Sequence, residues 1–354
     1  MKIGVLSNVF QQHFIPEVEE DLVEIATTVM RALQNYGHET AFYDVTESTF
    51  ERLRRRNFDI AFNVCERFNG NSTLEPHVPA MLELLGIKYT GSGPMALATC
   101  MNKARVKDIL VAHGIKTPKY QLFFKGNDNL SKELKFPLFT KPNQMDNSIG
   151  ITNDAVVRNE EQLRKRVKYL MQTFNQPVLV EEYIEGTDID AGVLGNNDDA
   201  LALPLIEVEY EELPKGIEPI FSYDAKWNKQ SQIYNKTYYT YEKGDIPKRT
   251  ENKIKEIAVD ICKILDIRDY GRVDLRLDRN NEPYVLEMNP NPGISADCST
   301  PFAAESLGIS HDKMINLILY HAMKRYGMIK PSMSFRAAAK SINTNQVVRN
   351  KIIA

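Results

Sequence analysis

The stretch from Asp269 to Gly293 constrains the fold of this chain more than any other. The alternation of polar and apolar side chains at residues 272–277 is followed by turn-forming residues and by a second extended run at 284–289. This pattern predicts an antiparallel β-hairpin. Pairing Leu277 with Tyr284 sets a register in which one face of the hairpin is apolar and the other carries charged side chains.

The charged face of this hairpin predicts a site for a divalent cation. In the stated register Asp274 lies opposite Glu287, and two carboxylates directly across a ladder repel unless a positive charge lies between them. Together with Asn289 they offer only oxygen ligands, which suits Mg²⁺ completed by substrate phosphates. The alternative is an exposed strand face neutralised by Arg272 and Arg276. The Asn-Pro-Asn-Pro-Gly run that follows favours the cation site, because it ends the strand abruptly, as where a chain folds over a ligand.

The overall composition excludes several classes of protein. The 354 residues are 43% hydrophobic and 26% charged, which is typical of a globular chain with two or three domains. Because 44 basic and 47 acidic residues give a net charge of -3, neither nucleic acid nor a membrane surface is expected as a partner. No run resembles a signal peptide or a membrane-spanning helix, so we expect a cytoplasmic protein. The scattered cysteines indicate neither disulfides nor a zinc site.

Strands and helices alternate along the first 93 residues, which predicts an α/β domain with a parallel, Rossmann-like sheet. Polar loops follow its strands, among them Cys65–Gly70, and open sheets bind ligands at that edge. Acidic residues begin the first helix, including Glu17 and Glu20. They complement the helix dipole, or one of them holds a substrate ammonium group. At the other end, residues 327–354 form a basic tail without an acidic residue.

A lysine at a strand end predicts a phosphate contact. Residues 136–142 form a short strand that reaches Lys141, and a polar loop around Ser148 follows it. A lysine in this position can hold phosphate while the amides of the loop cover it. The alternative is a solvated surface charge.

Two later segments predict the rest of a nucleotide site. The strand 178–183 delivers Glu181 and Tyr183 to its end, where they can meet a purine edge, and Asp188 in the next turn can reach ribose hydroxyls. A hinge between two lobes is the alternative, and both can hold because clefts form at lobe junctions. Residues 222–241 are long, irregular and polar, so we expect them to lie over the site.

In this order the motifs resemble the ATP-grasp superfamily and, within it, the D-alanine–D-alanine ligase group. The resemblance covers residues 1–325 and rests on YTGSG (89–93), MNK (101–103), FPLFTKP (136–142), VEEYIEGTD (180–188), YDAKW (223–227), GRVDLRL (271–277) and EMNPNPG (287–293). It implies an N-terminal Rossmann-like (pre-ATP-grasp) domain and two ATP-grasp lobes that grip ATP between their sheets. The domain boundaries that follow are 1–93, 94–187 and 188–326, with the tail at 327–354.

The resemblance also implies roles for individual residues. The implied nucleotide contacts are Lys103 and Lys141 for phosphates, Glu181 and Tyr183 for adenine, Asp188 for the ribose, and also Glu182. The implied ligands of Mg²⁺, or of Mn²⁺ in its place, are Asp274, Glu287 and Asn289. The implied catalytic residues are Arg272, Ser148 and Lys226. The implied substrate contacts are Glu17 or Glu20, Trp227, Gly293 and Cys298.

The implied chemistry is ATP-dependent amide formation through an acylphosphate, with release of ADP and phosphate. Relatives that make D-alanyl-D-alanine carry a Gly-Ser-Ser loop, a tyrosine and a serine where this chain has Asp146-Asn147-Ser148, Trp227 and Cys298. Because the nucleotide residues are kept and the substrate pocket is changed, we expect another amino acid or a small peptide as substrate. A homodimer is also an expectation of the resemblance.

Three alternatives remain open at this stage. One is a D-alanine–D-alanine ligase of peptidoglycan synthesis. Another is a nucleotide-binding module without catalysis. The last is a hydrolase that uses Asp274 and Glu287 as acid and base and needs no ATP.

Overall fold

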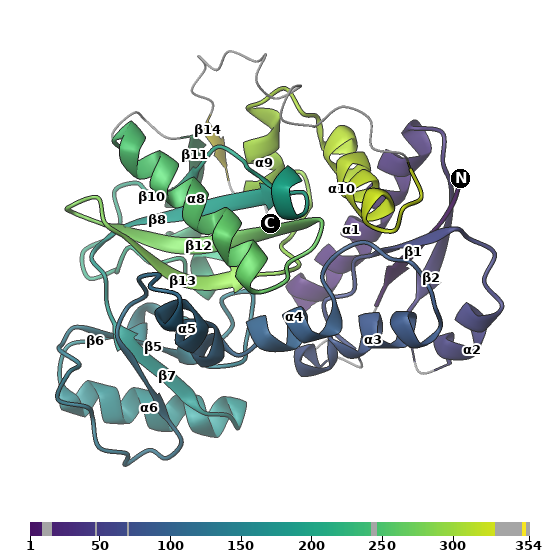
Figure 1. Cartoon of the computed structure of the whole chain (residues 1–354). Coiled ribbons are helices and arrows are strands. Elements are labelled where there is room, and N and C mark those ends of the chain that lie inside the picture. The colour runs from purple at the N-terminus through teal and green to yellow at the C-terminus, as the bar shows by residue number, and fades with distance from the viewer. Residues whose placement is uncertain (9–15, 47, 69–70, 242–245, 330–348, 352–354) are drawn as a thin grey trace.

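The computed structural model describes residues 1–8, 16–46, 48–68, 71–241, 246–329 and 349–351, without the side chains of residues 16–23 and 349–351. These residues form three β-sheets, and each sheet is the centre of one region of the molecule (Figure 1). The fold is therefore mixed α/β, as the sequence predicts.

The N-terminal region is built on a parallel sheet with the order β2-β1-β3. Its elements are β1 (Lys2–Ser7), α1 (Pro16–Asn35), β2 (Glu39–Asp44), α2 (Thr49–Arg54), β3 (Ile60–Asn63), η1 (Ser72–Leu74), α3 (His77–Leu84) and α4 (Pro94–Cys100). Strands β1 and β3 are short, largely apolar runs and are buried, as expected of a sheet covered on both faces. The residues that follow β3 reach the carboxyl edge of this sheet, where Glu66 and Arg67 line a cavity.

The central region is a four-stranded antiparallel sheet with the order β4-β7-β5-β6. Its elements are α5 (Lys103–Ala112), β4 (Tyr120–Phe123), β5 (Leu138–Pro142), η2 (Asn153–Ala155), β6 (Val156–Val157), α6 (Glu160–Phe174) and β7 (Val178–Glu182). Helix α6 is capped by Asn159, whose side chain accepts a hydrogen bond from the amide of Gln162 at 3.0 Å. The buried face of α6 packs on the sheet through Leu163, Val167 and Leu170.

The C-terminal region carries the largest sheet, with the order β13-β12-β8-β10-β11-β14 and β9 paired to β8. Its strands are β8 (Gly186–Leu194), β9 (Leu201–Ala202), β10 (Ile206–Tyr210), β11 (Thr237–Tyr241), β12 (Tyr270–Asp278), β13 (Pro283–Asn289) and β14 (Arg349–Lys351). Its helices are η3 (Asn197–Asp199), α7 (Tyr223–Lys226), η4 (Tyr234–Lys236), α8 (Lys248–Ile264), α9 (Ser299–Glu305) and α10 (His311–Arg325). Helix α8 covers one face of β8 and β12 through Ile254, Ala258 and Ile261, and the opposite face carries the polar residues that line the cavity.

The register predicted for the hairpin of β12 and β13 is confirmed near the proposed metal ligands and wrong near the turn. The observed pairs are Arg272 with Asn289, Asp274 with Glu287, Leu275 with Val285 and Leu277 with Pro283. The pattern predicts Leu277 opposite Tyr284 instead. The difference is a β-bulge after Asp274, in which Leu286 is the extra residue and lines the cavity.

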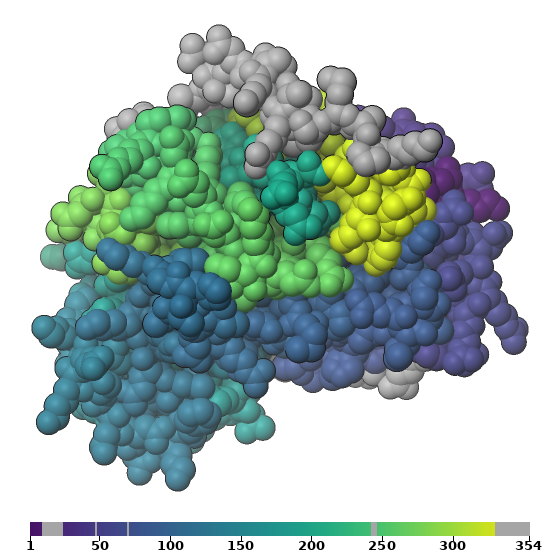
Figure 2. Space-filling view, in the orientation of Figure 1, coloured from purple at the N-terminus to yellow at the C-terminus, as the bar shows by residue number. Residues whose placement is uncertain are grey.

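Helix α10 brings the C-terminal region onto the N-terminal region. It packs against α1, and buried residues of both helices share one hydrophobic core with β1 and β3. Figure 2 shows the yellow surface of α10 lying against the purple and blue N-terminal surface. The predicted domain boundaries stay a prediction. Of the predicted basic tail, residues 330–348 and 352–354 lie outside the described residues, and β14 pairs with β11. Among the described residues, none of the helices has the length and apolar character to span a membrane.

Candidate active site

One cavity of about 380 Å³ lies between the central sheet, the C-terminal sheet and the loops after β3. It is lined by every predicted site residue whose side chain is described, together with Gly293: Lys103, Lys141, Ser148, Glu181, Glu182, Tyr183, Asp188, Lys226, Trp227, Arg272, Asp274, Glu287, Asn289 and Cys298. The predicted Glu17 and Glu20 fall in the first part of α1, residues 16–23, whose side chains the structure does not describe. Residues that are far apart in the sequence thus converge on one cavity.

Lys103 connects the first turn of α5 to the hairpin. Its side chain is 4% exposed, and its ammonium nitrogen lies 3.1 Å from Glu287 Oε2 and 3.3 Å from Asp146 Oδ1. Burial acts to lower the pKa of Lys103, but the charges of Glu287 and Asp146 outweigh burial and raise the pKa above its ordinary value. Lys103 is therefore a fixed positive charge beside the proposed metal ligands.

Glu181 lies between two buried lysines at the end of β7. Lys141 Nζ is 2.7 Å from Glu181 Oε1, and Lys107 Nζ is 2.6 Å from Glu181 Oε2. Burial lowers the pKa of Lys107 to about 8, although Glu181 acts in the opposite direction. The sequence analysis missed Lys107, yet a signal was present, because Lys103 and Lys107 are spaced i and i+4 on one face of α5. The carboxylate of Glu181 balances both lysines, so the adenine contact proposed for it stays a prediction.

The side of the cavity near the start of β8 carries aromatic rings and the carboxylate of Asp188. The rings of Phe139 and Tyr183 are stacked with centroids 6.5 Å apart, and the guanidinium of Arg276 lies 5.1 Å from the centre of the Tyr183 ring. Asp188 Oδ2 accepts a hydrogen bond from the hydroxyl of Tyr210 at 2.7 Å. A planar base fits beside such rings, with Asp188 within the same wall of the cavity.

The proposed metal ligands lie on β12 and β13, and two of them contact cationic side chains. Arg272 holds Asp274 through two hydrogen bonds of 2.6 Å and 2.9 Å, and Lys103 holds Glu287. Burial raises the pKa of Asp274 despite Arg272, whereas Lys103 and Lys141 outweigh burial at Glu287 and lower its pKa. Asn289 Nδ2 is buried and donates no hydrogen bond to the described residues.

This donor set fits a hard divalent cation. Two carboxylates and an amide supply oxygen ligands, which Mg²⁺ prefers. The neighbouring cations balance the carboxylates in this structure, as expected of acids that otherwise repel across a ladder. Among the described residues, no group of three or more His, Cys, Asp or Glu side chains is arranged to hold a metal ion. The proposed site therefore depends on the amide oxygen of Asn289 and on oxygens from a substrate.

The polar loop after β5 is held against two other regions through Asn147. Trp227 Nε1 donates to the carbonyl of Asn147 at 2.9 Å, and Lys226 Nζ donates to Asn147 Oδ1 at 3.0 Å. Asn147 Nδ2 donates to Glu66 Oε2 at 3.4 Å, and the hydroxyl of Ser148 donates to the carbonyl of Phe221 at 2.9 Å. The loop and the segment around Trp227 thus meet over the cavity, as the sequence analysis predicts for that segment.

The N-terminal wall of the cavity contains acids that the sequence analysis did not assign. Glu75 is buried, and its Oε1 accepts a hydrogen bond from Asn291 Nδ2 at 3.2 Å. Burial raises the pKa of Glu75 well above its ordinary value, and Asp146 adds to this effect. Glu66 and Arg67 line the same wall. The location was predictable from the Cys65–Gly70 loop, but the individual side chains were not.

The loop after β13 brings Cys298 to the cavity. A Cβ atom at Gly293 would lie 2.8 Å from Cys298 Sγ, so a glycine is needed for the thiol to pack there. Cys298 occupies the N-cap position of α9 without a capping hydrogen bond from its side chain, and it is partly exposed.

Comparisons with known proteins agree on one family. Residues 109–320 match the model described as the D-ala D-ala ligase C-terminus. An uncharacterised protein of Sinorhizobium fredii, y4sG, is 33% identical over 91% of this chain and 94% of its own length. A D-alanine–D-alanine ligase of Carboxydothermus hydrogenoformans is 32% identical over 90% of this chain and 97% of its own. A D-alanine–D-alanine ligase of Nitrosospira multiformis is 31% identical over 84% of this chain and 90% of its own length.

Solved structures share the fold. The D-alanine–D-alanine ligase of Bacillus anthracis in complex with ATP superposes with a TM-score of 0.72 at 22% identity, covering 93% of this chain and 99% of that one. The VanG D-Ala:D-Ser ligase of Enterococcus faecalis superposes with a TM-score of 0.70 at 22% identity, covering 91% of this chain and 99% of that one. The chain therefore belongs to the D-alanine–D-alanine ligase family and is an ATP-grasp carboxylate–amine ligase, an enzyme that forms carbon–nitrogen bonds.

Proposed function

We propose that this enzyme uses ATP and Mg²⁺ to join the carboxylate of an amino acid or small peptide to the amine of another. The observation that carries this proposal is the gathering of three cations and three oxygen donors around one cavity: Lys103, Lys141, Arg272, Asp274, Glu287 and Asn289. Cations fixed in a buried site offset the negative charge that develops when a phosphoryl group is transferred.

The proposed reaction has two steps. A carboxylate oxygen of the first substrate attacks the γ-phosphorus of ATP, and ADP leaves. The amine of the second substrate then attacks the acyl carbon, loses a proton, and phosphate leaves. Lys103 and Lys141 bind phosphate oxygens, and Arg272 offsets charge on the transferred group. A bound Mg²⁺ supplies further positive charge at those oxygens, and Asp274, Glu287 and Asn289 would hold it.

Closure over the cavity is part of the proposal. An acylphosphate hydrolyses if water reaches it, so the site has to be covered during the reaction. The contacts of Asn147 with Lys226 and Trp227 support this role for the loop after β5. Ser148 contributes through its hydrogen bond to Phe221.

The charges at the N-terminal end of the cavity support an amino acid or peptide as substrate. Glu66 and Glu75 are acids that complement a substrate ammonium group, and Arg67 and Lys226 are cations that complement a carboxylate. In this proposal Glu17 or Glu20 is an additional contact for the amine, and Trp227, Gly293 and Cys298 shape the pocket.

Two substrate classes compete. The relatives named D-alanine–D-alanine ligase favour D-alanine as both substrates. The replacement of a Gly-Ser-Ser loop by Asp146-Asn147-Ser148 favours a different amino acid or a small peptide, because Asn147 occupies the cavity and carries a larger side chain than serine. We favour the second class.

The experiment is a measurement of phosphate release from ATP and Mg²⁺ with single and paired D- and L-amino acids and dipeptides, with mass analysis of the products. Release with D-alanine alone, and D-alanyl-D-alanine as product, would replace our preferred substrate class by the first. Release with another pair identifies the substrates directly. ATP binding without release for any member of the panel would point to a larger substrate or to a nucleotide-binding module.

A variant pair tests the site in the same assay. Glu287→Gln removes a proposed metal ligand, and we expect turnover to fall by at least about a hundredfold. Glu282→Gln is the matched control, because Glu282 lies in the turn of the same hairpin and pairs with Lys116 and Lys253 outside the cavity. Full activity of Glu287→Gln would contradict the proposed metal site.

A further inference from the structure

Asp190 lies beside the proposed metal site and has no role in the function proposed above. On β8 it pairs with Asp274 of β12, which in turn pairs with Glu287 of β13. Side chains that are paired across neighbouring strands lie on the same face of a sheet. Three carboxylates therefore form one row across three strands at the wall of the cavity.

One guanidinium lies between two of these carboxylates. Arg272 donates two hydrogen bonds to Asp274, at 2.6 Å and 2.9 Å, and its Nε lies 3.5 Å from Asp190 Oδ2. The distance of 3.5 Å between Arg272 and Asp190 is that of an ion pair and is too long for a strong hydrogen bond. The two acids therefore share Arg272 unequally, with Asp274 as the main partner.

Asp190 is left with an unused oxygen. The residue is 7% exposed, and its Oδ2 is buried and accepts no hydrogen bond from the residues that the structure describes. A buried carboxylate oxygen without a hydrogen bond is unfavourable, so a donor that moves toward it gains stability. One such donor is Arg272, whose Nε already lies within ion-pair distance.

A metal ion on Asp274 changes this balance. The cation needs the carboxylate oxygens that Arg272 now holds, and two cations on the same oxygens repel each other. A guanidinium that loses this partner must find another acid, because an unpaired buried charge is costly.

We propose that Asp190 is a positioning residue that receives Arg272 when a divalent cation takes Asp274. The ion pair moves from one carboxylate to the next along the row, so that Arg272 stays in the cavity beside the transferred phosphoryl group. This inference rests on the proposed function, because it assumes the metal site at Asp274.

The test is a double-mutant cycle on metal binding rather than on activity. Mn²⁺ is titrated in the presence of a non-hydrolysable ATP analogue, and free Mn²⁺ is followed by its electron paramagnetic resonance signal. The variants are Asp190→Asn, Arg272→Gln and the double variant. Asp260→Asn is the control, because it removes one charge from the exposed side of α8.

We expect Asp190→Asn to weaken Mn²⁺ binding by about tenfold or more, the effect typical of residues that orient a metal ligand set. In the Arg272→Gln background the same change should cost at least about threefold less, because there is no guanidinium to receive. Unchanged binding by Asp190→Asn would overturn the inference. An equal loss in both backgrounds would also overturn it, since Asp190 would then be a direct ligand or a bystander charge.

Two further measurements keep these outcomes distinct. Thermal unfolding without metal checks that each variant folds, and Asp190→Ser serves as a second variant if Asp190→Asn does not. The proposed function itself fails if the wild-type protein with nucleotide binds no Mn²⁺, or if Asp274→Asn binds it as tightly as the wild type.

Discussion

Glu75 is a buried carboxylate whose ionisation opposes folding. Its pKa is raised above the ordinary 4.5, chiefly by burial. Below the ordinary pKa both folded and unfolded chains hold the proton, so the residue imposes no pH dependence there. Between the ordinary and the raised pKa, the folded chain keeps a proton that the unfolded chain has released, so stability falls as pH rises toward the raised pKa. At neutral pH the shift costs stability, because the unfolded chain has released the proton at no such penalty.

We therefore predict that Glu75→Gln is more stable than the wild type at neutral pH, by on the order of 1 kcal/mol, and equally stable near pH 4. Glutamine can still accept the hydrogen bond from Asn291. The same variant should raise the KM for the amine-bearing substrate about tenfold, because an amide cannot offer the ammonium group the negative charge that a carboxylate can. Urea unfolding at two pH values and steady-state kinetics measure the two effects.

The matched control for this prediction is Glu24→Gln, which changes an exposed acid on α1. It should alter neither quantity. An unchanged KM in Glu75→Gln would remove Glu75 from the proposed ammonium site, and a less stable variant at neutral pH would contradict the effect of burial.

Lys107 is another residue whose role follows from burial. Its side chain is 0% exposed and shares Glu181 with Lys141. Lys107→Met leaves Glu181 with one lysine, and breaking a buried ion pair costs about 3–5 kcal/mol. We predict such a loss in urea unfolding, together with a higher KM for ATP, because Lys141 must then neutralise Glu181 alone.

Lys116→Met is the comparison for that prediction. Lys116 pairs with Glu282 at 3.1 Å, but its side chain is 57% exposed, so its loss should cost much less stability than the loss of Lys107. Similar losses in the two variants would mean that the pair of Lys107 with Glu181 does not stabilise the fold.

At the scale of single residues, the sequence predicts which side chains have a functional role better than it predicts which side chains they contact. Lys141 could be predicted from its place at a strand end, and Lys103 and Arg272 from the motifs that carry the family resemblance. Glu75 and Lys107 belong to no such motif. Their burial depends on residues from other parts of the chain, such as Asn291 and Glu181, and that contact is a property of the folded molecule.

At the scale of elements, the hairpin of β12 and β13 shows what a pattern can and cannot predict. The alternation predicts which residues share a face, and the pairing of Asp274 with Glu287 is confirmed. The bulge was not predictable from alternation, because the turn is closed by local bonds. Asp278 Oδ1 accepts hydrogen bonds from the amides of Asn280 and Glu282, both at 2.8 Å. These bonds place Pro283 opposite Leu277. The extra residue, Leu286, is accommodated as a β-bulge next to the proposed metal ligands.

The contact between the loop after β5 and the segment around α7 makes a prediction about coupling. Trp227→Phe removes the hydrogen bond from the indole to the carbonyl of Asn147 and keeps most of the buried ring. A hydrogen bond contributes about 0.5–1.5 kcal/mol, so the covered state should become several-fold less populated. We predict a higher ratio of phosphate released to amide formed, because water then reaches the activated acyl group.

This ratio is measured by a phosphate assay and product quantification on the same samples. Tyr238→Phe is a control, because it removes a hydroxyl whose hydrogen bond to Asn235 lies outside the cavity. An unchanged ratio in Trp227→Phe would show that this contact does not cover the site.

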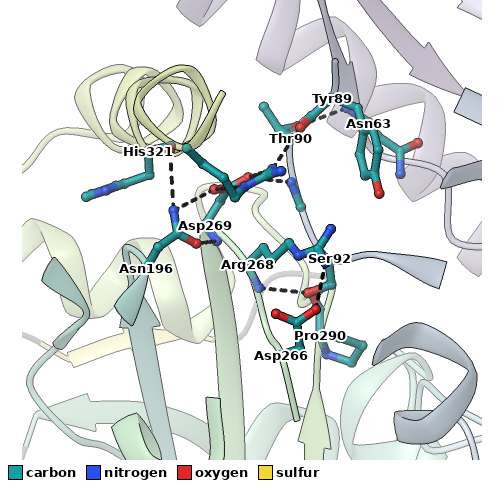
Figure 3. A network of polar contacts seen from close by, with 12 residues as sticks. Asn63, Tyr89, Thr90, Ser92, Asn196, Asp266, Arg268, Asp269, Pro290 and His321 are labelled. Carbon is teal, nitrogen blue, oxygen red and sulfur yellow. Dashed lines mark hydrogen bonds and ion pairs between the residues drawn. The ribbon is translucent and has the colours of Figure 1, made fainter. Parts of the chain in front are cut away.

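At the scale of the whole molecule, one polar network joins three distant parts of the chain. Figure 3 shows Asp269 between Asn196 and the segment that contains Tyr89, Thr90 and Ser92. Asp269 Oδ2 accepts from the amide of Gly91 at 2.9 Å, across 178 positions of sequence. The YTGSG motif was recognised from the sequence, but its partners were not, because nothing local marks a pairing over such a separation. The alternation of strands and helices therefore predicts each region of the fold, and the contacts between regions depend on residues that carry no local signal.

The last prediction concerns this junction. Asp269 is fully buried, and besides Gly91 it binds Arg325 of α10 at 2.7 Å and Asn196 at 2.9 Å. Asp269→Asn keeps the shape of the side chain but leaves Arg325 without its charged partner, which should cost about 3–5 kcal/mol in urea unfolding. Because Gly91 and α10 are both released, hydrogen exchange should become faster at residues 89–93 and 321–326.

The control lies three residues earlier in the chain. Asp266 pairs with Arg268 at 2.6 Å, but its side chain is 70% exposed, so Asp266→Asn should cost less than about 1 kcal/mol and leave exchange at the junction unchanged. If the two variants lose the same stability, the regions are held together by the hydrophobic core of α1 and α10 and not by the buried charge. If Asp269→Asn is less stable than Asp266→Asn and hydrogen exchange becomes faster at residues 89–93 and 321–326, then a single carboxylate couples the N-terminal region to the sheet that carries the proposed metal ligands.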